Sequence, residues 1–192
     1  MEGEIFNRKG HVNFGIAFKN FYNKPVDNLL TFEWQHSAGD FGKIINGGIS
    51  GMKRTIQESI ENHKDDEKAL QFLETQTDIC DAVIDWAHKC SEKALALSKN
   101  VSNATYKENL ERLSRSLKNV PEKPAKSFYE AILSLYVCYG LIPDSIGLID
   151  RYLYRFYKAD IESGVLTNEE ASAYLQELFL MLQARIHKSS DR

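Results

Sequence analysis

Apolar residues recur at steps of three and four along most of the chain after residue 65. The longest such run covers residues 65–98, and its apolar positions are Ala69, Leu73, Cys80, Val83, Ile84, Ala87, Cys90, Ala94 and Leu97. This spacing places one apolar stripe along an α-helix. At 1.5 Å per residue the helix would be about 50 Å long, so the pattern predicts a spine for the molecule.

Two further helices are predicted after this spine. The first covers residues 105–118 and ends before a pair of prolines, which cannot continue a helix. The second begins at Ser127, where Glu130 three residues later completes a capping box. It continues through the apolar run 131–139 and ends at Gly140. A run that is apolar nearly all round predicts a helix covered on most sides.

The last part of the chain has the pattern of two more helices. One covers about 148–161 and is followed by Gly164. The other opens with a second capping box, Thr167 and Glu170, and extends to about His187.

The beginning of the chain is less regular. Residues 40–46 and 49–62 have helical spacing and are separated by the pair Gly47–Gly48. Residues 1–38 carry aromatic side chains but no sustained period, so an irregular segment is expected there. The sequence therefore predicts one mainly α domain, with the helical region at 39–192 and few or no strands.

Composition narrows the class of protein. The net charge is −3 and no run of lysine or arginine occurs, which argues against nucleic-acid and membrane-surface binders. No apolar stretch reaches the roughly 18 residues of a membrane span, and the polar, acidic N-terminus does not resemble a signal peptide. Three cysteines form no disulfide framework, so a reducing cytoplasm is expected.

An acidic stripe on the longest predicted helix is a candidate metal site. It consists of Glu74, Asp78, Asp81, Asp85 and His88, and Asp85-x-x-His88 shares its ligand spacing with Glu33-x-x-His36. Dimetal helix bundles use such pairs, with their ligands pointing inward. At 100° per residue this stripe lies nearly opposite the apolar one, which favours a solvated face.

Two other groups have equally simple explanations. Cys80, Cys90 and Cys138 lie on apolar helix faces and have no basic cluster near them in the sequence, which is typical of packing rather than of a nucleophile. The glycines at 39–48 could cradle a phosphate, but no preceding strand or Gly-Lys-Ser/Thr accompanies them. A tight junction between helices is favoured for them.

Three segments resemble the glycyl radical enzymes of the pyruvate formate-lyase type. The family pattern S-x-G-R-x-D-Q-Y-L-Y-P-F-Y-x-x-D, then G-x-L-T-x-E-E-A, is matched by Ser145, Gly147, Asp150, Tyr152-Leu153-Tyr154, Phe156-Tyr157, Asp160, Gly164, Leu166-Thr167 and Glu169-Glu170-Ala171. Residues 120–131 are similar to V-P-x-x-P-A-x-T-F-x-E-A, and residues 36–51 are similar to H-x-x-x-D-Y-x-x-V-L-x-x-G-L-x-G. Leu148, Arg151 and Arg155 replace the usual arginine, glutamine and proline, which indicates a divergent branch.

The resemblance implies an α/β barrel domain, of which this chain would supply the early helical portion. It also implies radical cleavage of C–C or C–heteroatom bonds by a lyase, dehydratase or formate C-acetyltransferase. In that family an activating enzyme with S-adenosylmethionine and an iron–sulfur cluster forms a glycyl radical, which passes to a cysteine. No R-V-x-G-Y-like motif occurs here, so both radical residues are expected outside this chain, which would be inactive alone. The alternative is a non-catalytic helical interaction or scaffold protein derived from the same fold.

The resemblance places His36, Asp40 and Ser145 at the substrate. A histidine and a carboxylate can hold and deprotonate a substrate hydroxyl, and a serine can orient it. Asp40 could equally cap the helix that follows it, and Ser145 could close a turn. No catalytic residue, metal ligand or bound cofactor is expected. The expected partners are a small-molecule substrate, the activating enzyme, the remainder of the domain and a second copy of the chain.

Overall fold

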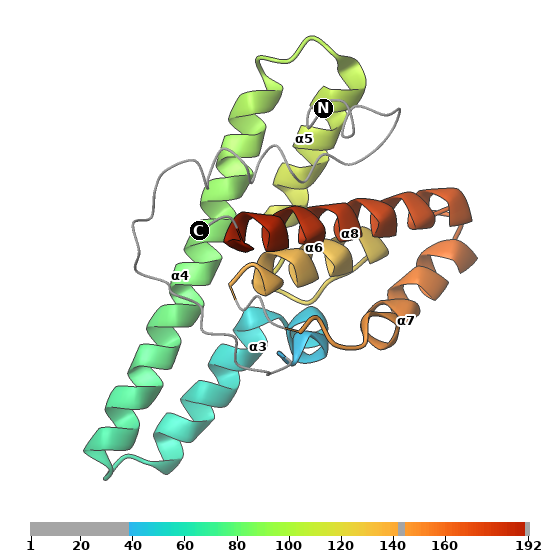
Figure 1. Cartoon of the computed structure of the whole chain (residues 1–192). Helices are drawn as coiled ribbons and strands as arrows, with labels where there is room; N and C mark the ends of the chain where they lie inside the picture. Colours follow the sequence, from blue (N-terminus) through green and yellow to red (C-terminus); the bar gives the residue numbers. More distant parts are fainter. Residues whose placement is uncertain (1–38, 142–144, 191–192) are drawn as a thin grey trace.

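The computed structural model describes residues 39–141 and 145–190, with side chains up to residue 183. Every regular element in these ranges is a helix (Figure 1). The helices are α3 (Phe41–Asn62), α4 (Glu67–Ser98), α5 (Ala104–Leu117), α6 (Phe128–Tyr139), α7 (Ile149–Glu162) and α8 (Asn168–Ser190). The mainly α fold is therefore confirmed for the described residues, and the expected irregular segment 1–38 lies outside them.

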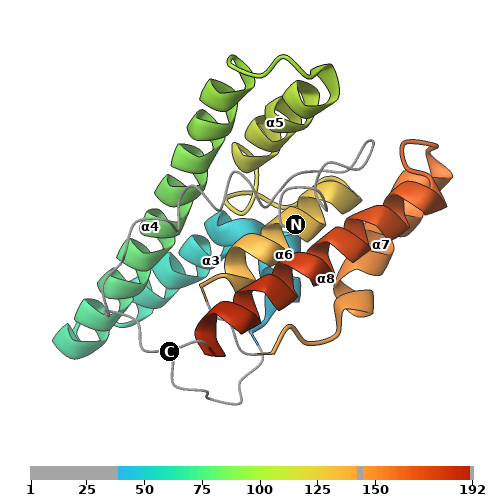
Figure 2. The ribbon, with the colours of Figure 1, turned by 45° about the horizontal axis from the view of Figure 1, so that its top comes forward.

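α4 is the spine that its periodicity predicts. α3 packs against one half of it and α5 against the other, so that the three helices form one layer (Figures 1 and 2). Ser91 of α4 lies in the interface between α4 and α5, where its hydroxyl donates a hydrogen bond of 2.7 Å to the backbone carbonyl of Ser114 in α5. No described helix is both long and apolar enough to cross a bilayer.

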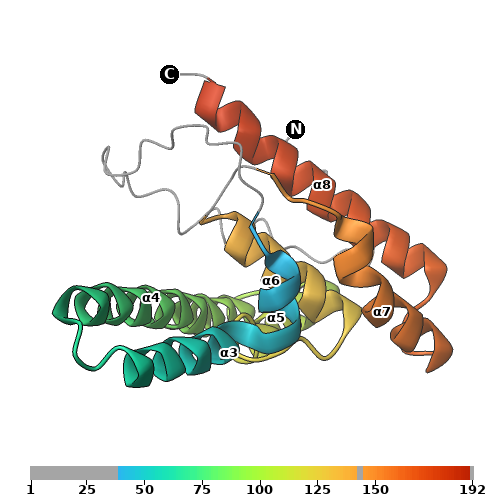
Figure 3. The same ribbon diagram turned by 90° about the horizontal axis from the view of Figure 1, so that it is seen from below.

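α6 is the centre of the molecule. It lies between the α3–α4–α5 layer on one side and α8, with α7 beside it, on the other (Figure 3). All residues of the apolar run 131–139 are buried, with exposures of 0–6%. The prediction of a helix covered on most sides is therefore confirmed. On neighbouring α7, Tyr154 is 61% exposed.

A kink divides α3 at Gly48, whose φ of 68° lies in the left-handed region. The kink turns two backbone N–H groups toward the loop that follows α5. Ile49 N–H donates to the carbonyl of Pro121 and Ser50 N–H to that of Glu122, both at 2.9 Å. The predicted break at Gly47–Gly48 thus appears as a kink, and Gly48 makes the expected tight junction, since a Cβ there would lie 2.4 Å from the carbonyl oxygen of Glu122.

Asp160 of α7 closes the N-terminus of α6. Its carboxylate accepts a hydrogen bond of 2.7 Å from the backbone N–H of Phe128. The ring of Tyr157, one turn earlier on α7, meets the ring of Phe128 edge-on at 5.9 Å. Since all three residues belong to the motifs that carry the family resemblance, part of that resemblance reflects how α6 and α7 are joined.

Of the two predicted capping boxes, the one at α8 forms in full and the one at α6 forms in part. Thr167 and Glu170 cap reciprocally at the start of α8: Thr167 N–H donates to the Glu170 carboxylate at 2.9 Å, and Glu170 N–H to the Thr167 hydroxyl at 3.1 Å. At α6 the Ser127 hydroxyl accepts from Glu130 N–H at 3.2 Å. The Glu130 carboxylate bonds instead to Lys126 N–H at 2.9 Å, which ties the entering loop to the helix.

Candidate functional site

Asp40 and Ser145 both lie at the surface, at helix starts and turns. The Asp40 carboxylate caps α3 by accepting a hydrogen bond of 3.0 Å from Lys43 N–H. The Ser145 hydroxyl accepts one of 3.3 Å from Gly147 N–H, which closes the turn into α7. Both structural roles considered for these residues are therefore present, and His36 lies outside the described residues.

The side chain of Tyr152 of α7 lies between the segments that carry Asp40 and Ser145. Its ring would lie 3.1 Å from a Cβ added at Gly42, and its hydroxyl oxygen 2.5 Å from one added at Gly147. One tyrosine side chain therefore extends from the start of α3 to the turn before α7. Asp40 is two residues from one end of this contact and Ser145 two residues from the other, so the fold brings both to the same corner of the molecule.

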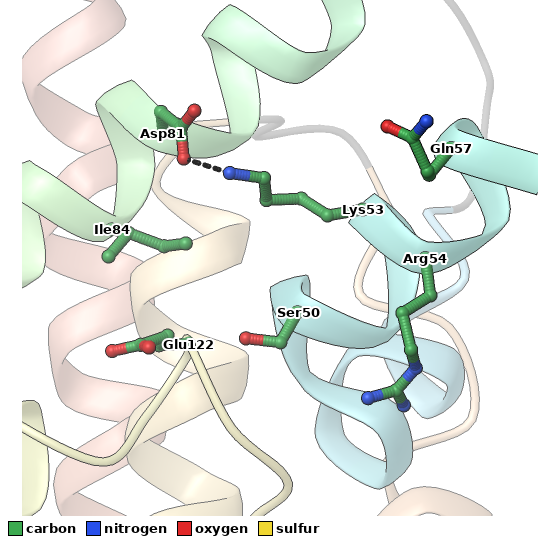
Figure 4. Close-up of a pocket in the computed structure, with 7 residues that line it drawn as sticks. All are labelled: Ser50, Lys53, Arg54, Gln57, Asp81, Ile84 and Glu122. Carbon is green, nitrogen blue, oxygen red and sulfur yellow. Dashed lines mark hydrogen bonds and ion pairs between the residues drawn. The ribbon is translucent and has the colours of Figure 1, made fainter. Parts of the chain in front are cut away.

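An open groove of about 470 Å³ lies between α3, α4 and the loop after α5 (Figure 4). It is lined by Ser50, Lys53, Arg54, Gln57, Asp81, Ile84 and Glu122. Lys53 reaches across to an ion pair with Asp81, whereas Arg54 points away from that pair. The sequence gives no local signal for this groove, because its lining comes from three separate elements whose packing is tertiary. Because Lys53 and Asp81 already pair across it, the groove is better described as an interface between helices than as a preformed ligand site.

The acidic stripe of α4 faces this groove in part. Asp81 pairs with Lys53, and His88 lies 3.0 Å from the carboxylate of Glu122. The other three members of the stripe are exposed. Among the described side chains, no three histidine, cysteine or carboxylate groups gather closely enough to hold a metal ion.

The three cysteines are buried in helix packing. Burial raises the pKa of the Cys90 and Cys138 thiols to about 12 and also raises that of Cys80, where nearby Lys53 opposes the shift. All three are protonated near neutral pH, and a buried thiol in mid-helix packs as a small apolar group. None of them is placed as an activated nucleophile.

A polar cluster joins α5, α6 and α8. The Arg112 guanidinium lies 3.9 Å from the ring centroid of Tyr129 and donates a hydrogen bond of 2.6 Å to the Tyr174 hydroxyl. The two tyrosine rings meet edge-on at 5.7 Å. Burial, and secondarily the nearby carboxylate of Glu177, raises the pKa of Tyr129, while Arg112 opposes that shift. Its members come from three helices, so no local sequence signal could have revealed it.

Comparisons with known proteins place the chain among relatives of similar sequence and structure. The family model described as pyruvate formate lyase-like matches residues 28–191. The isethionate sulfite-lyase of Oleidesulfovibrio alaskensis is 30% identical over 175 residues, which are 84% of this chain and 21% of that protein. The trans-4-hydroxy-L-proline dehydratase of Clostridioides difficile is 23% identical, over 90% of this chain and 26% of the relative.

Solved structures give the same relationship. A structure reported for 1,2-propanediol dehydration in Roseburia inulinivorans superposes with a TM-score of 0.71 at 28% identity, over 74% of this chain and 19% of that one. The glycerol-bound, B12-independent glycerol dehydratase of Clostridium butyricum also superposes with a TM-score of 0.71, at 25% identity. The match covers 76% of this chain and 20% of that one. The chain spans about a fifth of the length of these relatives.

Proposed function

Because the chain belongs to the pyruvate formate lyase-like family, we propose that it forms the helical part of a glycyl radical enzyme that cleaves a carbon–heteroatom bond. The observation that carries the proposal is the agreement of family match and fold. The match covers residues 28–191, and the superposition on the propanediol-dehydrating enzyme has a TM-score of 0.71. The family motifs also make contacts in this fold, such as the Asp160 cap on α6.

The relatives narrow the reaction within that class. Their names describe a sulfite-lyase and dehydratases acting on hydroxyproline, glycerol and propanediol. The last three substrates are small molecules with hydroxyl groups. We therefore favour elimination from a small hydroxylated substrate over the acyl transfer of a formate C-acetyltransferase.

His36, Asp40 and Ser145 are the proposed substrate contacts. The cap on α3 uses Oδ1 of Asp40, so Oδ2 is available to accept a hydrogen bond from a substrate hydroxyl. Ser145 accepts from Gly147 and can still donate its hydroxyl hydrogen. Both side chains are exposed at the corner that Tyr152 connects. In this proposal Asp40 and Ser145 hold the substrate, and His36 takes or returns a proton.

The radical residues belong elsewhere in the complete enzyme. The sequence has no R-V-x-G-Y-like glycine motif, and its cysteines are buried in helices rather than held in a loop at a substrate site. The residues of this chain therefore do not fit the radical relay. The proposed assembly obtains its glycyl radical in the remaining part of the domain, from an activating enzyme that uses S-adenosylmethionine and an iron–sulfur cluster. We place this assembly in the cytoplasm.

Anoxic turnover by the assembled, activated enzyme tests the proposal. Glycerol, 1,2-propanediol, trans-4-hydroxy-L-proline and isethionate would be supplied separately, and the elimination products measured. We expect one of them to react, and the substitutions His36→Ala and Ser145→Ala to raise KM or lower kcat. An assembly that transfers only acyl groups would refute the reaction class.

The non-catalytic scaffold makes a different prediction. If neither the reading frame that continues from this chain nor another gene of the source organism encodes an R-V-x-G-Y-like glycine, no turnover is possible, and the scaffold interpretation replaces the enzyme. The coding sequence around the gene is the first observation to make.

A further inference from the structure

The outward face of α8 carries no charge over the stretch Ala171–Gln183. The exposed residues there are Ser172, Gln176, Phe179, Leu180 and Gln183. Phe179 is 54% exposed and Leu180 is 43% exposed. At 100° per residue, these positions form one continuous side of the helix. This face is therefore an uncharged surface with two large apolar side chains.

The one charged residue of this stretch is turned inward. Glu177 is 5% exposed and acts electrostatically on Tyr129 in the cluster with Arg112. A surface helix normally has its charges outside and its apolar side chains inside. α8 reverses this arrangement at Glu177, Phe179 and Leu180. Such a helix is typical of an element that is covered on both sides.

α4 of the same chain shows what a solvated helix looks like here. Its exposed residues include Glu74, Asp78, Asp81, Asp85, Lys89, Glu92 and Lys93. It also has an exposed aromatic residue, Phe72 at 63%, but with charged residues on the same helix. The absence of exposed charge is therefore a property of residues 171–183 of α8, since the first turn of that helix carries the exposed carboxylates Glu169 and Glu170.

None of the described helices covers the outer face of α8. α6 lies against its inner side, and α3, α4 and α5 lie beyond α6 (Figure 3). The relatives are far longer, because this chain spans about a fifth of them. In a protein of their length, the other four fifths supply enough chain to cover this face.

We propose that the outer face of α8 is the docking surface for the remaining part of the catalytic domain. The inference rests on the proposed function and adds the surface through which the assembly forms. The chemistry defines the partner surface: it is apolar opposite Phe179 and Leu180, and it offers uncharged hydrogen-bonding groups to the amides of Gln176 and Gln183. A charged partner surface would lose hydration here without gaining an ion pair.

Co-purification tests this surface. The tagged 192-residue chain would be produced anoxically together with the polypeptide of the same organism that carries the R-V-x-G-Y-like glycine. The substitutions are Phe179→Glu and Leu180→Glu on α8, with Phe72→Glu on α4 as the matched control of similar exposure. We expect each α8 variant to reduce the recovered partner at least tenfold and the control to leave it unchanged. Circular dichroism would show that all three variants keep their helices.

The possible outcomes separate the surface from the function. Full recovery with both α8 variants would refute the docking surface while leaving the proposed function intact. Recovery of only a second copy of this chain, abolished by Leu180→Glu, would refute the proposed partner and identify a homodimer face. Equal losses with Phe72→Glu would show a general solubility effect and would also overturn the inference.

Discussion

Gly47 and Gly48 are neighbours in α3 with opposite structural requirements. Gly48 has a φ of 68°, and a Cβ there would lie 2.4 Å from the carbonyl oxygen of Glu122, whereas a Cβ at Gly47 meets nothing within 4 Å. We expect Gly48→Ala to lower the free energy of unfolding by about 2 kcal/mol or more, because strain at positive φ adds to a backbone clash. Gly47→Ala should raise it by about 0.5–1 kcal/mol. Urea denaturation followed by circular dichroism measures both, and equal effects would contradict the kink.

The buried thiols predict a loss of stability in alkali. In the folded chain the pKa values of Cys90 and Cys138 are raised from 9.0 to about 12. Unfolded thiols ionise near the lower value, so the stabilisation is complete below it and is lost progressively as the pH rises toward the higher one. The urea midpoint should therefore fall as the pH rises from about 9 toward about 12. Cys138→Ala should weaken this pH dependence; an unchanged slope would show that Cys138 does not contribute.

At the scale of the elements, Asp160 couples α7 to α6. Its carboxylate binds the backbone N–H of Phe128, and charged hydrogen bonds of this kind contribute about 1.5–3 kcal/mol. Asp160→Ala should lower the free energy of unfolding by about that amount, with increased hydrogen exchange in the first turn of α6. Glu162→Ala on the same helix removes only an exposed contact with Lys158 and should cost less than about 0.5 kcal/mol. If the two variants were equally stable, the cap would have no energetic role.

The sequence was sufficient for the helices because their ends are marked locally. The helix predicted at 105–118 is found at Ala104–Leu117, and the one predicted at 148–161 at Ile149–Glu162. Caps and apolar periodicity act within one turn, so a single sequence shows them. The Asp160 cap joins residues 32 positions apart and has no such local signal.

The candidate site was less accessible to sequence reasoning. Asp40 and Ser145 were chosen by resemblance, and only the fold shows that Tyr152 connects their surroundings. The Arg112 cluster and the uncharged face of α8 were missed. The cluster and the face both depend on which side of each helix is turned toward its neighbours. For a helix as weakly amphipathic as α8, tertiary packing and not the local sequence decides which side that is.

At the scale of the whole molecule, the uncovered face of α8 predicts self-association of the isolated chain. Exposed apolar patches of a few hundred Å² commonly find a partner, and an uncharged face meets no repulsion from its own copy. Sedimentation velocity should show the average mass rising with concentration across the micromolar range, and Leu180→Glu should suppress the rise. A monomer at every concentration would contradict this prediction.

Electron paramagnetic resonance after anoxic activation tests the central claim most directly. The claim is that this chain supplies helices to a glycyl radical enzyme whose radical residues lie elsewhere. The chain alone, treated with the activating enzyme and S-adenosylmethionine, should give no glycyl doublet. The same treatment of the chain assembled with the polypeptide carrying the R-V-x-G-Y-like glycine should give one. A doublet from the 192-residue chain alone, or none from the activated assembly, would contradict the account.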